Sequence, residues 1–140
     1  MPILQADTPD GYELPEVACQ FSLEHFQRGS GPNIHTDVEA ARREGLSAPV
    51  ATGPQVAALT FRQLRDAFGR GWIVGGKCEL TFRKPVPVDA FCVARAVVTG
   101  REQVTEGVRI NCDVWIENLA HDKLIVGTAS GVVEHGRAAA

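Results

Sequence analysis

The sequence lacks the features that would tie the chain to a membrane or to nucleic acid. None of its apolar runs approaches the roughly 18 residues that a membrane-spanning helix needs, and no charged start precedes an apolar segment as in a secretory signal. The formal net charge is -3, and the longest basic runs are the pairs Arg42-Arg43 and Arg83-Lys84. Nucleic-acid binding usually needs a concentrated basic face. We therefore expect a cytoplasmic protein that binds neither nucleic acid nor a membrane.

Paired cysteine motifs are also missing. The four cysteines form no Cys-x-x-Cys motif, so neither a zinc ribbon nor a thioredoxin-type site is expected; they are Cys19, Cys78, Cys92 and Cys112. Each lies in an apolar, strand-like run, which favours free, buried thiols in a reducing compartment. A metal pair at His35-x-Asp37 has no third ligand nearby in the sequence, so we expect no metal site.

The rest of the composition is that of an ordinary globular protein. Hydrophobic residues make up 44% of the chain and charged residues 22%, which argues against disorder. A chain of 140 residues buries a sizeable core, and no linker or internal repeat divides it. We predict one domain over residues 1–140.

The longest predicted helix covers residues 54–68. It begins with the uncharged run Pro-Gln-Val-Ala-Ala-Leu-Thr-Phe, and charge returns only with Arg62, Arg65 and Asp66. A helix that is apolar all round for two turns is typical of burial on all sides. We expect a buried helix roughly 22 Å long with a curved sheet wrapped around it. Before it, Asp37 is expected to cap a short helix over residues 38–44 that ends at Gly45.

Strands account for most of the remaining chain. The clearest is residues 107–118, where apolar and polar residues alternate with the period of a sheet that has one wet face. The other predicted strands cover residues 17–21, 72–83 with a kink at Gly75-Gly76, 90–99 and 123–134. An extended arm is expected before them, over residues 1–16, and Ser22 is a candidate cap for one more helix. Helices and strands that are segregated along the chain indicate an α+β fold.

Several short motifs follow one another in a recognisable order: His35-x-Asp37, Ala40, Gly45, Val50-Ala51-Thr52-Gly53 and Phe82-x-x-Pro85-Val86. In order and spacing they resemble the MaoC-like family of (R)-specific enoyl-CoA hydratases and dehydratases, and the match covers nearly the whole chain. The resemblance implies a hotdog fold, in which an antiparallel sheet wraps around a long central helix. It also implies a homodimer or a larger assembly of dimers, with the active site at the subunit interface.

The same resemblance implies a reaction. Family members add water across the 2,3 double bond of an enoyl thioester or reverse that step, with coenzyme A or an acyl carrier protein as part of the substrate and no separate cofactor. Such chemistry needs a base, an acid and donors for the oxyanion that develops on the thioester carbonyl. The resemblance assigns proton transfer to His35 and oxyanion binding to the N–H of Gly53. It places Asn33 or Ser30 beside the water and Thr52 beside the substrate.

The chain departs from the family pattern in the loop before His35. The pattern Ser-Gly-Asp-x-Asn-Pro-Ile-His-x-Asp corresponds here to Gly-Ser-Gly-Pro-Asn-Ile-His-Thr-Asp, so the loop is shorter and the Asp of the catalytic Asp/His pair is missing. No carboxylate lies between Glu24 and His35, and Thr52 replaces the histidine of the family's Ala-His-Gly. Asp37 is a conceivable substitute for the missing carboxylate, but its spacing fits a helix cap better.

Each of these residues also has a structural interpretation. A lone histidine is more often structural than catalytic, and Gly53 is well placed simply to make the turn into a helix that starts with Pro54. Arg83 and Lys84 either contact the phosphates of coenzyme A or are solvated charges beside an edge strand. The resemblance favours the functional interpretation for His35 and Gly53 and leaves both open for the basic pair.

Three functions follow from these observations. The first is a MaoC-like hydratase or dehydratase. The second is a non-catalytic or partner-dependent hotdog subunit that binds acyl thioesters and pairs with a chain carrying the missing Asp. The third is a hotdog thioesterase, which usually places a carboxylate on or near the long helix, and residues 54–61 contain none.

Overall fold

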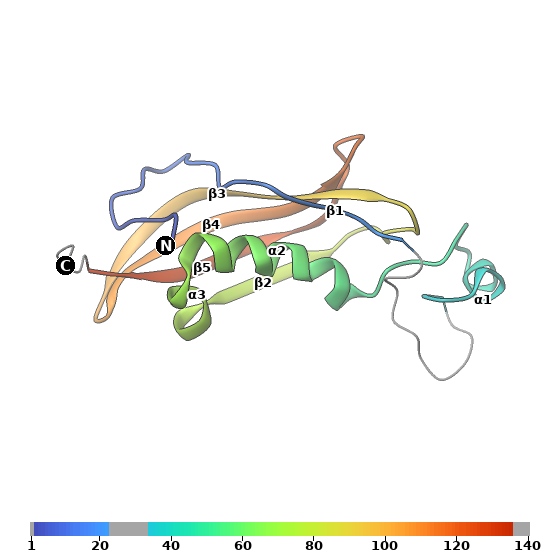
Figure 1. Ribbon diagram of the computed structural model, residues 1–140, viewed down its shortest axis with the longest axis horizontal. Helices are drawn as coiled ribbons and strands as arrows, with labels where there is room; N and C mark the ends of the chain where they lie inside the picture. Colours follow the sequence, from blue (N-terminus) through green and yellow to red (C-terminus); the bar gives the residue numbers. More distant parts are fainter. Residues whose placement is uncertain (1, 23–33, 136–140) are drawn as a thin grey trace.

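A five-stranded antiparallel sheet with one long helix across its face forms the protein (Figure 1). The computed structural model describes residues 2–22 and 34–135. The strands lie in the order β1-β3-β4-β5-β2. Their bounds are Val17–Gln20 for β1, Lys77–Phe82 for β2, Phe91–Val104 for β3, Gly107–Asn118 for β4 and Lys123–Glu134 for β5. The helices are α1 (Val38–Arg43), α2 (Gly53–Phe68) and α3 (Arg70–Gly75). The predicted α+β class is confirmed.

The centre of the sheet is β4, which has the bounds predicted from its alternation. Ile110, Cys112, Val114 and Ile116 are at most 1% exposed and face α2, while Asp113 is exposed on the other side. The long strands β3 and β5 pair with β4 on its two sides. The pairing of β3 with β4 has one shift in register, between Val98 and Gly100. Because β3 continues past this shift to Val104, the strand is longer than the predicted residues 90–99.

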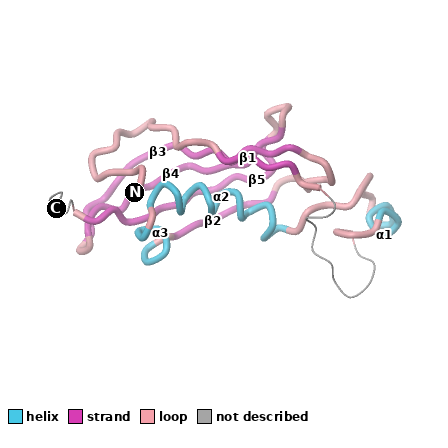
Figure 2. Tube along the Cα trace, viewed as in Figure 1, coloured by secondary structure: helices cyan, strands magenta, loops and turns pink. Residues whose placement is uncertain are grey.

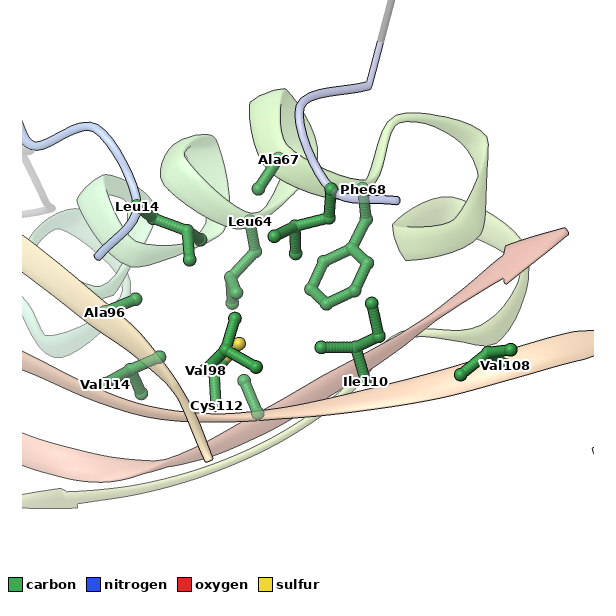
Figure 3. Close-up of a cluster of buried hydrophobic side chains, with 12 residues drawn as sticks. Leu14, Leu64, Ala67, Phe68, Ala96, Val98, Val108, Ile110, Cys112 and Val114 are labelled. Carbon is green, nitrogen blue, oxygen red and sulfur yellow. The ribbon is translucent and has the colours of Figure 1, made fainter. Parts of the chain in front are cut away.

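The core lies between α2 and the sheet (Figure 3). Leu64 and Phe68 point from the helix toward the strands, where they meet Val98, Ile110 and Cys112 of β3 and β4. Full burial of a leucine or phenylalanine side chain stabilises a fold by about 1.5–3 kcal/mol. The predicted wrapping of a sheet around the long helix is therefore confirmed.

The prediction that this helix is buried on all sides is wrong. Ala58, Phe61, Arg62 and Arg65 are exposed, and Phe61 is 40% accessible. The reason is geometric, since the sheet of a single chain covers one side of the helix and leaves the opposite side open (Figure 1). The uncharged start of the helix thus includes Phe61, an apolar side chain that the described residues cover only in part.

The region after α2 also differs from its prediction. The chain turns at Gly69, whose φ is 60°, and enters α3 where a strand from residue 72 was expected. A Cβ on Gly71 would lie 1.8 Å from the carbonyl oxygen of Val132, so α3 packs on β5 at a distance that only glycine allows. Trp72, expected at the start of that strand, instead stacks on Phe61 with the two ring centroids 6.1 Å apart. The strand β2 begins only at Lys77.

The arm before β1 contains no helix or named strand where the structure describes it, yet part of it is buried. Leu4 is 1% exposed and its N–H donates to the carbonyl of Ala67 at 2.9 Å, which attaches the arm to the end of α2. The strand predicted over residues 17–21 is confirmed as β1. The helix predicted after Ser22 falls in residues 23–33, outside the described part of the chain. Among the described helices, none combines the length and the apolar character needed to cross a membrane.

All four cysteines are free thiols, but only half of them are buried. Cys92 and Cys112 face the core, and burial raises the pKa of Cys92 to about 11 and that of Cys112 to about 12. Cys19 and Cys78 are partly exposed, so the predicted burial is confirmed for two of the four thiols.

Candidate functional site

Of the residues singled out by sequence, those that the structure describes lie on three segments that run side by side next to the start of α2. The N–H of Val50 donates to the carbonyl of Ile34 at 3.0 Å, and the N–H of Ala51 donates to the carbonyl of Val86 at 2.8 Å. Val50 also bridges to Pro87 in antiparallel fashion. Segments that are far apart in sequence, around residues 34, 50 and 86, are therefore fixed to one another by backbone hydrogen bonds.

His35 is tied to the middle segment by its side chain. Its Nδ1 lies 2.8 Å from the carbonyl oxygen of Val50, and the ring is partly buried. Because a carbonyl oxygen only accepts, Nδ1 must carry the proton of this hydrogen bond. The neutral ring then has its basic lone pair on Nε2. The tautomer with a basic Nε2 is the one required of a general base that is oriented through Nδ1.

The start of α2 carries a complete capping box. The Oγ1 of Thr52 accepts from the N–H of Gln55 at 3.3 Å, and the Oε1 of Gln55 accepts from the N–H of Thr52 at 3.3 Å. The next N–H, that of Gly53, has no hydrogen-bond partner among the described residues. The first N–H groups of a helix point outward at the positive end of its dipole, so this group suits an oxyanion.

A pocket of about 240 Å³ opens beside Gly53. Buried side chains form its inner wall, and the exposed Arg83 and Lys84 stand at its opening; the full lining is Ala51, Gly53, Val56, Phe82, Arg83, Lys84, Pro85, Val86 and Ile125. An apolar interior with a few polar groups at the entrance is the usual composition of a small-molecule site. The pocket brings together three of the residues predicted from sequence: Gly53, Arg83 and Lys84.

The basic pair Arg83 and Lys84 is held in place by its backbone, while its side chains are exposed. Both Arg83 and Lys84 donate their N–H groups to the carbonyl of Leu124, at 2.8 and 3.2 Å. The Nζ of Lys84 lies 3.9 Å from a carboxylate oxygen of Asp122, and both side chains are more than half exposed. An exposed ion pair of this length is weak and leaves the lysine available to an anionic group.

The predicted cap at Asp37 is confirmed. Its Oδ1 accepts from the N–H of Glu39 at 2.7 Å and from that of Ala40 at 3.2 Å. The helix that it caps, α1, lies beyond the end of the sheet and apart from α2 (Figure 2). One oxygen of Asp37 is therefore committed to helix capping, as its spacing in the sequence indicated.

Two of the predicted site residues, Ser30 and Asn33, fall in residues 23–33, outside the described part of the chain. The hydroxyl of Thr52, predicted beside the substrate, is engaged in the capping box and is not part of the pocket lining. Within the ranges that the structure describes, no three His, Cys, Asp or Glu residues gather closely enough to hold a metal ion.

One member of the pocket, Phe82, was noted in the sequence only as part of a family motif. The ring of Phe82 lies against Gly53: a Cβ built on this glycine would be 3.4 Å from Cε1 and 3.5 Å from Cζ. The side chain is 54% exposed. A phenylalanine at the end of an alternating strand gives no signal in the sequence that separates it from ordinary core residues, and only the fold places it next to the helix start.

Solved structures with the same fold are known. The chain superposes on a MaoC-like dehydratase from Rhodospirillum rubrum with a TM-score of 0.79 at 20% identity, covering 94% of this chain and 96% of that one. For the R-hydratase PhaJ1 from Pseudomonas aeruginosa the TM-score is 0.77 at 18% identity, with 96% and 88% covered. The ChsH1-ChsH2 complex from Mycobacterium tuberculosis matches with a TM-score of 0.70 at 18% identity, over 91% and 99%.

These likenesses define the chain as a hotdog-fold protein, as the motifs predicted. The solved structures that share this fold include a MaoC-like dehydratase and an R-hydratase. No protein-family model and no curated protein sequence matches it. The structural likeness, at these low identities, extends to the fold.

Proposed function

We propose that the protein hydrates 2-enoyl thioesters, or dehydrates the corresponding 3-hydroxyacyl thioesters, in the pocket beside Gly53. The observation that carries the proposal is the N–H of Gly53 at the start of helix α2, which has no hydrogen-bond partner in residues 2–22 and 34–135 and lies in a pocket with an apolar interior and a basic entrance. An acyl thioester has the matching parts: an apolar acyl chain, a carbonyl oxygen that becomes negative during reaction, and an anionic carrier. Coenzyme A is the carrier that we propose.

The roles of the residues follow from this arrangement. The N–H of Gly53 donates to the thioester carbonyl oxygen and stabilises the enolate-like charge that develops there. The Nε2 of His35, with Nδ1 held by Val50, takes a proton from the water that adds to C3 and returns a proton at C2. Arg83 and Lys84 attract the phosphates of the carrier. Residues 23–33 precede His35 directly, and we propose that Ser30 and Asn33 position the water.

The proposal is tested by the loss of enoyl absorbance from crotonyl-CoA. We expect turnover by the wild type, an (R)-3-hydroxyacyl product on chiral analysis, and a decrease of at least about 100-fold in kcat for His35→Ala, as for the loss of a general base. His135→Ala is the matched control, because His135 is exposed at the end of the described chain. Equal rates for the two variants would remove His35 from the mechanism.

A second candidate function is supported by the missing carboxylate. No Asp or Glu lies between Glu24 and His35, where the family's catalytic Asp is found, and one solved structure of the same fold is the complex of two proteins, ChsH1 and ChsH2. In this case the chain binds the thioester and a partner chain supplies the acid or base. Tight binding of butyryl-CoA without turnover of any enoyl-CoA by the purified protein would favour this candidate over the first.

We propose that the protein assembles as a homodimer or a larger oligomer. Ile73 and Val74 of α3 are 73% and 70% exposed, and Phe61 on the open side of α2 is 40% exposed. Large apolar side chains exposed together on the surface of a chain often mark a site of protein–protein contact. Light scattering should give a mass of at least two chains, and Ile73→Asp should lower that mass if this surface is the contact.

A further inference from the structure

Phe82 occupies the space in front of Gly53. The ring atoms Cε1 and Cζ lie 3.4 and 3.5 Å from the position that a Cβ of Gly53 would take, which is van der Waals contact. A single group the size of a methyl would fill the space between the ring and the glycine in this arrangement. Any molecule that reaches the N–H of Gly53 from this side must therefore pass along the ring.

The other walls of the pocket are less able to move. Val56, Val86 and Ile125 are 2%, 2% and 1% exposed and belong to a packed core cluster. Phe82, in contrast, is 54% exposed and is the last residue of β2, a strand at the edge of the sheet. A closely packed interior yields little, so these three side chains are fixed in place, and Phe82 is the wall that lies directly against Gly53. The shape of the pocket next to Gly53 is thus set mainly by Phe82.

We infer that Phe82 selects the acyl group by its width next to the thioester carbonyl, so that acyl groups unbranched at C2 are the substrates. The inference rests on the proposed function, which places the carbonyl oxygen on the N–H of Gly53. With the oxygen in that position, the C2 atom lies one bond from the carbonyl carbon and alongside the ring of Phe82. A hydrogen on C2 passes the ring, and a methyl group on C2 collides with it.

The length of the acyl chain is governed by different residues. The chain extends away from Gly53 toward the buried inner wall formed by Val56, Val86 and Ile125. Removal of the Phe82 ring therefore widens the pocket at the carbonyl and leaves its depth unchanged. If the ring of Phe82 served only to cover the core, its removal would change the rates for all acyl groups equally. A change confined to acyl groups branched at C2 therefore indicates selection by Phe82.

The experiment compares kcat/KM for crotonyl-CoA, 2-methylcrotonyl-CoA and 2-octenoyl-CoA in the wild type, Phe82→Ala and Phe82→Leu. A pocket that gains or loses room for one methyl group changes relative rates by about 10- to 200-fold. We expect the ratio for 2-methylcrotonyl over crotonyl to rise at least about tenfold in Phe82→Ala and less in Phe82→Leu, with an unchanged ratio for octenoyl over crotonyl. Phe91→Ala, a partly exposed phenylalanine outside the pocket, is the control and should alter neither ratio.

An unchanged methyl-branch ratio in both Phe82 variants would overturn the inference while the proposed function stands. If the wild type turns over no enoyl-CoA, the proposed function fails, and the inference is then tested by dissociation constants for butyryl-CoA and 2-methylpropanoyl-CoA. A preference for the unbranched ligand that is lost in Phe82→Ala would support selection by Phe82. Equal affinity of the wild type for both ligands, or no affinity for either, would overturn it.

Discussion

The Nδ1 atom of His35 lies 2.8 Å from the carbonyl oxygen of Val50, and Val50 stands three residues before Gly53 in the chain. One short segment therefore orients the proposed base and ends in the proposed oxyanion donor. His35 does not itself line the pocket beside Gly53, and the hydrogen bond to Val50 ties its ring to the segment that leads into the helix.

This hydrogen bond gives a way to separate the chemistry of His35 from its structural role. The side-chain amide of asparagine places an N–H close to the position of Nδ1, so His35→Asn should retain the bond to Val50 but has no base. We expect the free energy of unfolding of His35→Asn to lie within about 0.5 kcal/mol of the wild-type value, and that of His35→Ala to be lower by about 1 kcal/mol. Both variants should lose hydration of crotonyl-CoA. Activity that survives in His35→Asn would show that the residue is structural.

A second prediction concerns Gly53. Its φ is not positive, and an added Cβ would only touch the ring of Phe82 at 3.4 Å, so Gly53→Ala should fold normally. The new methyl group fills the space through which the carbonyl approaches the N–H, and a displacement of about 1 Å at a reacting centre costs about 100-fold in rate. Gly100→Ala is the matched control, because nothing lies within 4 Å of its added Cβ. Circular dichroism melts and crotonyl-CoA kinetics on both variants make the comparison.

The sequence predicted the elements that are determined by interactions between residues close together in the chain, such as β4 and the cap of α1. The period-two alternation of β4 gave its bounds correctly because one face of that strand packs on the core, and Asp37 caps α1 because its carboxylate reaches the first N–H groups of the helix. The uncharged start of α2 led to the wrong prediction that the helix is buried on all sides, because a single chain can leave an apolar side chain of a helix open for another chain to cover. Residues 72–76 were likewise predicted as part of a strand, whereas the turn at Gly69 and the close approach of Gly71 to Val132 accompany a helix there.

The site was predictable in part. Gly53, Arg83 and Lys84 were linked through family motifs, and they line one pocket. The roles of Val50 and Phe82 depend on distances between segments that are remote in sequence, and composition and spacing carry no such distances. The residues of a pocket wall come from several elements, so their selection requires the fold.

A third prediction concerns Gln63, which connects three parts of the fold. From α2 its Nε2 donates to the carbonyl of Pro15 at 2.9 Å and to that of Ala94 at 3.1 Å, and the side chain is 2% exposed. Gln63→Ala leaves the buried carbonyl of Ala94 with one donor fewer and opens space, so we expect a loss of about 1–3 kcal/mol in the free energy of unfolding. The neighbouring exposed Arg62→Ala should change it by less than about 0.5 kcal/mol. Urea denaturation measures both.

Thiol reactivity provides a fourth prediction. Burial raises the pKa of Cys92 to about 11 and of Cys112 to about 12, and the reactive species is the thiolate, so neither should react in the folded protein at pH 8. Any rapid labelling should come from the partly exposed Cys19 and Cys78, and because burial raises the pKa of Cys78 as well, Cys19 should react first. Labelling with a coloured disulfide reagent should give at most two thiols per chain when folded and four in denaturant. Mass spectrometry of the labelled peptides identifies the sites, and early labelling of Cys112 would contradict the packing of β4.

The last prediction rests on a buried carboxylate on the outer side of the sheet. Glu117 of β4 is 6% exposed, and its Oε2 lies 2.6 Å from Nδ1 of His121. Its Oε1 accepts from Nε1 of Trp115 at 3.2 Å and pairs with Arg95, which also contacts Glu16 at 3.0 Å. The hydrogen bond from His121 comes first among the causes that hold the pKa of Glu117 below its ordinary value of 4.5, followed by those from Trp115 and Arg95, while burial acts in the opposite direction.

A carboxyl group whose pKa is lower in the folded state stabilises the fold at pH values above its ordinary pKa. That contribution is lost as the pH falls through the folded-state pKa, because the folded protein must then take up a proton at the cost of these partners. Glu117→Gln should therefore lower the free energy of unfolding by about 1–3 kcal/mol at pH 7, with the difference from wild type shrinking as the pH falls below about 4.5. Glu106→Gln, at an exposed turn position, should keep the pH dependence of the wild type. Urea midpoints between pH 3 and pH 7 measure the effect, and a difference between Glu117→Gln and wild type that is constant with pH would show that Glu117 stabilises the sheet by packing alone.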